Sequence, residues 1–118
     1  MILLKILVLR HGQSAANAQG IIQGQGGRQG GAAWPLTDIG RLQAQHANKL
    51  LVSLASSDGS EDSYFWRAYS SDLKRAKNTA EIALAFDSES NKSQLLHESE
   101  RLRLDERLRE FALGVRWV

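Results

Sequence analysis

An apolar run near the N-terminus constrains the fold of this chain more than any other feature. Residues 2–9 read ILLKILVL, a nearly unbroken series of Ile, Leu and Val without the alternation of a half-exposed strand. This pattern is typical of a strand covered on both faces, as in the parallel sheets of α/β proteins. At 118 residues the chain has room for one small domain with such a sheet.

Predicted helices and further strands follow this first strand in alternation. We expect a short helix over residues 14–18 with Ser14 as its cap, and an aromatic-rich strand over residues 64–70. A short third strand is predicted over residues 94–97, whereas residues 102–118 carry no assignable pattern. The order strand, helix, strand, helix, strand predicts an α/β layer fold with parallel strands and right-handed crossovers.

Two longer helices are predicted from apolar residues at helical spacing. The first begins after its capping residue Thr37, and the second opens at Ser71 or Asp72. The predicted buried side of the first helix consists of Ile39, Leu42, Ala47, Leu50, Leu51 and Leu54. The predicted buried side of the second consists of Leu73, Ala76, Ala80, Ala83 and Leu84.

Three polar or glycine-rich segments separate these elements. Residues 20–31 hold six glycines and are predicted to be a loop, because glycine loses the most backbone entropy on ordering. Residues 56–63 and 87–93 are polar connectors. The glycine loop lacks the Gly-Lys-Ser/Thr ending of a nucleotide-binding P-loop, and its single arginine with a net charge of +2 argues against nucleic-acid binding.

Composition narrows the class of protein further. The chain has no cysteine, which excludes disulfides, thiolate nucleophiles and Cys-ligated zinc. Its N-terminal apolar run has no basic flank or small-residue cleavage site and is too short to span a bilayer. We therefore predict a cytoplasmic protein that has neither membrane nor nucleic-acid partners.

Chemistry is concentrated where predicted strands end. Arg10, His11 and Gly12 follow the first strand, and ligands of parallel α/β sheets collect at that edge. Arginine suits phosphate because its planar fork makes two charge-assisted hydrogen bonds. A second arginine, Arg75, lies four residues after Ser71, at the start of the helix that follows the second strand.

Four motifs in order resemble the histidine phosphatase superfamily, also called the phosphoglycerate mutase-like family. They are Arg10-His11-Gly12, residues 35–44, residues 70–76 and residues 108–114, and the resemblance runs from about residue 4 to residue 115. Residues 21–26 and 107–110 are most similar to TIGAR-type fructose-2,6-bisphosphatases. The resemblance implies a three-layer α/β/α fold of which residues 1–118 are the N-terminal portion of a single domain, without the C-terminal half.

The resemblance also implies residue roles and a phosphatase reaction on a small phosphorylated metabolite. His11 becomes a phosphohistidine, Arg10 and Arg75 hold the phosphoryl oxygens, and Glu110 is the acid/base. The substrate side is lined by Ser14, Asn17, Gln23 and Gly24. Neither a metal nor another cofactor is expected.

One part of the family pattern is absent from this sequence. The family carries a second catalytic histidine in a Ser-His-Gly type strand, and neither His46 nor His97 stands in such a motif. In the family sheet that strand lies between the first and second strands, so we expect an empty slot here and a chain that alone is unstable or poorly active. Two alternatives stay open: an impaired member serving as a binding or scaffolding module, and a phosphoglycerate mutase-type phosphotransferase.

Overall fold

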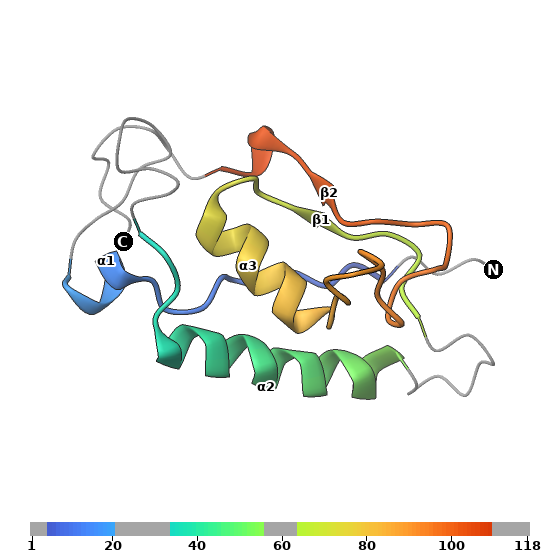
Figure 1. Cartoon of the computed structure of the whole chain (residues 1–118), viewed down its shortest axis with the longest axis horizontal. Helices are drawn as coiled ribbons and strands as arrows, with labels where there is room; N and C mark the ends of the chain where they lie inside the picture. The colour runs from blue at the N-terminus through green and yellow to red at the C-terminus, as the bar shows by residue number, and fades with distance from the viewer. Residues whose placement is uncertain (1–4, 21–33, 56–63, 110–118) are drawn as a thin grey trace.

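A computed structural model describes residues 5–20, 34–55 and 64–109 of the chain. Two strands pair in parallel, as the α/β prediction requires, and the two longer helices lie to one side of them (Figure 1). The elements in chain order are α1 (Ala15–Ala18), α2 (Asp38–Ala55), β1 (Tyr69–Ser70), α3 (Lys74–Ala83), β2 (Arg103–Leu104) and the 3₁₀ helix η1 (Glu106–Leu108). The predicted glycine loop apart from Gly20, the connector at 56–63 and everything after residue 109 lie outside the described residues. Among the described residues, no helix combines the length and the apolarity that a bilayer span requires.

Packing between α2 and α3 forms the main helical contact of the structure. The Asn48 side chain of α2 donates a hydrogen bond to the Ala83 carbonyl, at the last residue of α3, over 2.9 Å. Beyond this bond, toward the C-terminal end of α2, lies the apolar core. Its buried members are Ala55, Leu84, Leu95 and Leu96.

The predicted strand at 64–70 is present only in part. Tyr69 and Ser70 form β1, and Phe65 makes an isolated parallel bridge to Leu96 from the predicted third strand. The partner of β1 is β2, which lies in the stretch that pattern analysis left unassigned. Both pairings are parallel, so the predicted strand direction is confirmed while the predicted strand lengths are too long.

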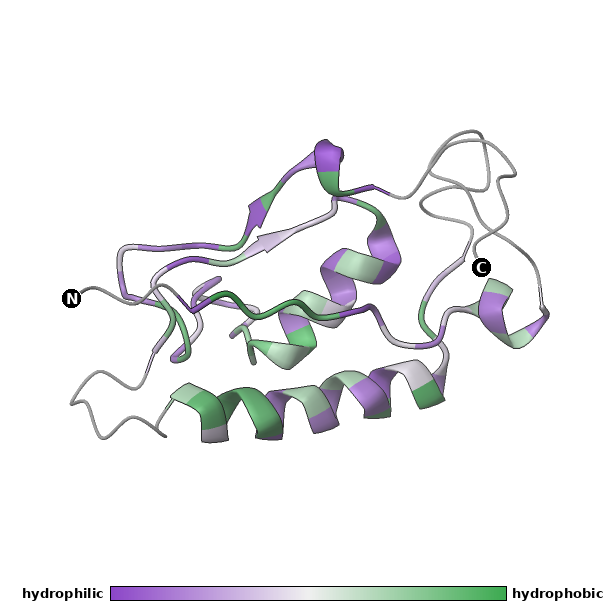
Figure 2. Ribbon diagram, turned by 180° about the vertical axis from the view of Figure 1, so that it is seen from behind, coloured by the Kyte–Doolittle hydropathy of each residue, from purple (hydrophilic) through white to green (hydrophobic). Residues whose placement is uncertain are grey.

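Residues 5–9 differ from the buried strand that the sequence predicts. The described residues contain no strand that pairs with them, and Ile6 and Val8 are 73% and 94% exposed. Figure 2 shows this apolar segment crossing α3 with no described helix over its outer face. A strand acquires order and burial from its neighbours, so an apolar pattern alone does not bury it.

The buried sides of both long helices also differ from prediction. On α2, four residues of the predicted buried side are exposed, namely Ile39, Leu42, Leu50 and Leu54. The other two, Ala47 and Leu51, are half-buried, and Leu51 packs against the core as predicted. The fully buried residues are the small ones Gly40, Ala44 and Ala55. The helix approaches its neighbours closely through glycine and alanine, so the four exposed side chains lie outside the contact. On α3, Leu73, Ala83 and Leu84 are buried as predicted, Ala76 and Ala80 are half-buried, and Arg75 and Thr79 occupy the buried face.

Capping residues are where local prediction succeeds best. The Ser14 hydroxyl accepts the Asn17 N–H at 3.2 Å, and the Asn17 side chain accepts the Ser14 N–H at 3.0 Å, which completes a capping box. The Thr37 hydroxyl accepts the Gly40 N–H at 3.1 Å at the start of α2. The second long helix, however, begins at Lys74, a little later than Ser71 or Asp72, because the Ser71 hydroxyl turns the chain by accepting the Leu73 N–H.

Two glycines allow α2 to cross the chain just after His11. A β-carbon on Gly12 would lie 2.3 Å from the Gly40 carbonyl oxygen, and one on Gly40 would lie 2.1 Å from the Gln13 carbonyl oxygen. Real β-carbons do not approach backbone atoms so closely, so only glycine fits either position. The crossing fixes the residue after His11 against the first turns of α2.

Two arginine–aspartate pairs hold the end of the described chain. Arg109 donates to both carboxylate oxygens of Asp72, in the loop between β1 and α3, at 2.6 and 2.5 Å. Arg107 likewise binds Asp105, the residue that caps η1. The Arg107 hydrogen bond lowers the pKa of Asp105 to about 2, and the Arg109 hydrogen bond lowers the pKa of Asp72 below its usual range.

The exposure of residues 5–9 predicts that Val8→Lys is tolerated. Because Val8 is almost fully exposed, we expect the free energy of unfolding to change by about 0.5 kcal/mol or less. Leu96→Ala, in the core, is the contrast and should cost about 2–4 kcal/mol. Urea unfolding of both variants measures this, and a large loss with Val8→Lys would restore the buried-strand interpretation.

The glycine crossing predicts that Gly40→Ala destabilises the fold although alanine favours helices. The propensity gain is about 1 kcal/mol, whereas overpacking against backbone costs about 1–3 kcal/mol. A lower thermal midpoint, measured by circular dichroism, is the expected result. A midpoint raised by the substitution would mean that α2 and residues 12–13 are farther apart.

The aspartate pairs predict a loss of stability in acid. A carboxylate whose pKa is lowered in the folded state stabilises it fully above its unfolded pKa of about 4, and that stabilisation disappears as the pH falls toward the folded value. For Asp105 this window runs from about pH 4 to about 2. Urea unfolding across this window should show a shallower loss for Asp105→Asn than for the unsubstituted chain, and equal slopes would contradict the prediction.

Candidate active site

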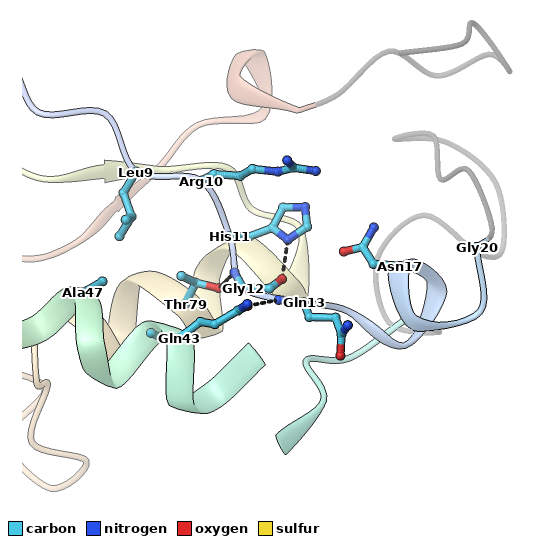
Figure 3. A pocket seen from close by; sticks show the side chains of 11 residues that line it. Leu9, Arg10, His11, Gly12, Gln13, Asn17, Gly20, Gln43, Ala47 and Thr79 are labelled. Atoms are coloured by element: carbon cyan, nitrogen blue, oxygen red, sulfur yellow. Dashed lines mark hydrogen bonds between the residues drawn. The ribbon is translucent and has the colours of Figure 1, made fainter. Parts of the chain in front are cut away.

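The orientation and tautomer of the His11 ring are set by its own neighbour. Its Nδ1 lies 2.7 Å from the Gly12 carbonyl oxygen, and since a carbonyl only accepts hydrogen bonds, Nδ1 carries the proton (Figure 3). In the neutral imidazole this leaves the lone pair on Nε2. The geometry therefore presets the tautomer that a nucleophilic Nε2 requires.

The backbone that follows His11 is fixed by two helices. The Gly12 N–H donates to the Thr79 hydroxyl of α3 at 3.1 Å. The Gln13 N–H donates to the Gln43 side chain of α2 at 2.8 Å, and its carbonyl accepts the Thr37 N–H at 3.0 Å. These bonds join the glycine crossing in holding the His11 segment in place.

An open pocket of about 510 Å³ surrounds this segment. Figure 3 shows the Arg10 side chain extending past the His11 ring, with Asn17 of α1 facing them across the opening. Arg10 is exposed and His11 half-buried, so a small anion could reach both. The lining residues are Leu9, Arg10, His11, Gly12, Gln13, Asn17, Gly20, Gln43, Ala44, Ala47 and Thr79.

The other predicted site residues are placed differently. Arg75 is fully buried on α3 and does not line this pocket, although it lies one turn from Thr79 on the same buried face. Ser14 is also fully buried and caps α1, whereas Asn17 lines the pocket. Gln23, Gly24 and Glu110 lie outside the described residues.

The remaining two histidines lie away from His11. His46 is exposed on α2, and His97 stacks on Trp66 with ring centres 4.9 Å apart. Neither belongs to the lining of the described pocket, which agrees with their failure to match the family's second histidine motif. Within the described ranges, no three His, Asp or Glu side chains gather as a metal site would need.

Sequence reasoning missed the residues of α2 and α3 that contact the backbone just after His11. Gln43 and Gly40 fall within the motif at 35–44 but had no role assigned, and Thr79 was not singled out. One signal was available, because Thr79 lies four residues after Arg75 and so shares its helix face. The hydroxyl bond to Gly12 depends on how α3 meets a segment that is distant in sequence.

Known proteins match this chain in family and in fold. The family model of the histidine phosphatase superfamily (branch 1) matches residues 6–117. Fructose-2,6-bisphosphatase TIGAR B of Danio rerio is 31% identical over 115 residues, which are 98% of this chain and 37% of that protein. A crystal structure from Escherichia coli, with a proposed assignment as an alpha-ribazole-5'-P phosphatase, matches with a TM-score of 0.56 and 27% identity over 86% of this chain and 37% of its own.

The structural match confirms the α/β, phosphoglycerate mutase-like fold class, of which the described residues form an incomplete part. The chain spans 37% of the length of each of these two relatives. The family match covers nearly all of the chain and includes the pocket around His11. The chain belongs to the histidine phosphatase superfamily.

Proposed function

We propose that this protein hydrolyses a phosphomonoester of a small phosphorylated metabolite through a phosphohistidine at His11. The observation that carries the proposal is the 2.7 Å bond from His11 Nδ1 to the Gly12 carbonyl, in a pocket that Arg10 also lines. The bond leaves the lone pair of the neutral ring on Nε2 and so prepares that nitrogen for attack on phosphorus. Family membership supports the same reaction type.

The proposed reaction has two steps. In the first, the Nε2 lone pair forms a bond to phosphorus while the bond from phosphorus to the leaving oxygen breaks, and that oxygen takes up a proton. In the second, water attacks the phosphohistidine, the nitrogen–phosphorus bond breaks, and inorganic phosphate leaves. Each step moves negative charge among phosphoryl oxygens, which nearby guanidinium groups stabilise.

Three residues complete the proposed machinery. Arg10 extends past the His11 ring at the pocket opening and is placed to hold phosphoryl oxygens (Figure 3). We assign the second phosphate-binding role to Arg75, whose helix contacts Gly12 one turn farther along through Thr79. Glu110 is proposed to protonate the leaving oxygen and then to activate water; it follows Arg109, which is bound to Asp72 beside the start of α3.

A small phosphorylated metabolite is the proposed substrate class. Both named relatives carry the name of a phosphatase of such a compound, one a sugar bisphosphate and the other a ribazole phosphate. Within this class, a sugar phosphate such as fructose 2,6-bisphosphate is the finer proposal, because the sequence is 31% identical to TIGAR B over most of this chain. The proposed location is the cytoplasm.

A catalytically impaired member with a binding role is the second candidate. It is favoured by the placement of the histidines, since only His11 of the three lines the described pocket. A phosphotransferase of the mutase type would share the first step and differ in the acceptor. Two observations distinguish these alternatives. The first is whether a phosphohistidine forms, and the second is whether water or a sugar acid then accepts the phosphoryl group.

His11→Ala is expected to abolish covalent phosphoryl labelling of the chain. The variant removes the attacking nitrogen, so incubation with ³²P-labelled sugar phosphate followed by alkaline gel analysis should show no acid-labile label. His46→Ala, which changes an exposed histidine of α2, is the matched control and should label like the unsubstituted chain. Label with no release of phosphate would favour the binding role, label lost to a sugar acid would favour the mutase, and label retained in His11→Ala would overturn the proposal.

A further inference from the structure

We propose that Thr79 is a positioning residue that holds the His11 loop against α3. In this way it maintains the ring orientation and the Nδ1-protonated tautomer that phosphoryl transfer to Nε2 needs. The inference rests on the proposed function of His11 and adds a residue of the pocket lining that acts on the His11 loop. It concerns a single hydroxyl shared by two parts of the site.

The Thr79 hydroxyl makes two hydrogen bonds within the protein, one as donor and one as acceptor. It donates to the Arg75 carbonyl at 2.7 Å and accepts the Gly12 N–H at 3.1 Å. Thr79 is only 3% exposed, so water does not compete for these bonds. The single proton of the hydroxyl is committed to the Arg75 carbonyl, so Thr79 cannot donate a hydrogen bond to substrate while this bond holds.

The bond to Arg75 alone would be unremarkable. Threonine in a helix often donates to the carbonyl four residues earlier, with no role beyond that turn. The second bond is different, because Gly12 lies 67 residues away in sequence and directly follows His11. One hydroxyl therefore connects the turn of α3 that carries Arg75 to the loop that carries the proposed nucleophile.

Gly12 connects Thr79 to the imidazole through two adjoining peptide groups. The N–H of the His11–Gly12 peptide donates to Thr79. The carbonyl of the Gly12–Gln13 peptide accepts the proton of His11 Nδ1 at 2.7 Å, and the N–H of that same peptide donates to Gln43. Since the Gly12 residue is buried between α2 and α3, an unbonded N–H would favour rotation of the backbone. Rotation at Gly12 would move the carbonyl away from Nδ1 and release the other tautomer of His11.

Thr79→Val tests the role, because it removes the hydroxyl and keeps the branched shape. In the full chain we expect the Gly12 amide hydrogen to exchange about tenfold faster, as loss of one net hydrogen bond allows. Nitrogen-15 spectra of the His11 ring should change from mainly the Nδ1-protonated tautomer to a mixture of both. Orthovanadate, a phosphate mimic that Nε2 can bind, should bind about tenfold more weakly. Thr79→Ser should restore all three signals.

Ser93→Ala is the matched control. Ser93 is also a buried hydroxyl that donates to a helix carbonyl, that of Leu84, and accepts a backbone N–H, that of Leu95, but it lies in the core. Its loss should lower stability without altering the His11 tautomer. If Ser93→Ala changes the tautomer as Thr79→Val does, or if Thr79→Val leaves it unaltered, the positioning role is wrong.

Two further readouts keep the test decisive. If Thr79→Val does not fold, the unsubstituted chain decides: its Gly12 amide must exchange more slowly than in a short peptide of the same local sequence, and equal rates would overturn the inference. Failure of the unsubstituted chain to bind orthovanadate would count against the proposed function. In that case the amide and tautomer signals still decide the role of Thr79.

Discussion

The site depends on one contact between backbones, the crossing of Gly12 and Gln13 with Gly40. Neither glycine has room for a β-carbon there, so the His11 loop lies directly against the first turns of α2. This close approach brings the Gln43 side chain within hydrogen-bond distance of the Gln13 N–H. The Gly12 N–H points toward α3, where it donates to the Thr79 hydroxyl. A larger residue at either glycine would push the His11 loop away from α2, and the hydrogen bonds to Gln43 and Thr79 would then be too long to form.

The sequence predicts which residues carry the chemistry of the site better than it predicts the contacts that hold them in place. Arg10 and His11 lie together at a pocket because they are adjacent in sequence and follow an apolar run. Their supports could not be predicted in the same way, since the contact of Thr79 with Gly12 depends on how two distant segments meet. Arg75 shows the limit most clearly, because its position on α3 follows from helical spacing and its full burial depends on tertiary surroundings.

The fold shows the same division between local and distant determinants. The caps at Ser14 and Thr37 are set by atoms within three residues and were predicted correctly. The buried strand at residues 2–9 was not, because residues 5–9 have, among the segments that the structure describes, no strand paired with them and remain largely exposed. Hydrophobic spacing likewise predicted α2 as a helix and placed Leu51 against the core correctly, but it missed the buried Gly40 and Ala44, since close helix packing selects small residues over large ones.

The bond between Asn48 and the Ala83 carbonyl joins the two long helices at one point. From it, α2 reaches about 12 Å to Gly40 and α3 about 6 Å to Thr79, at 1.5 Å of rise for each residue. The helices meet the His11 loop at different distances from this shared bond, α2 through Gly40 and α3 through Thr79. The interhelical spacing and the orientation of the loop therefore have a common framework, so a substitution that alters how α2 packs on α3 also alters the loop.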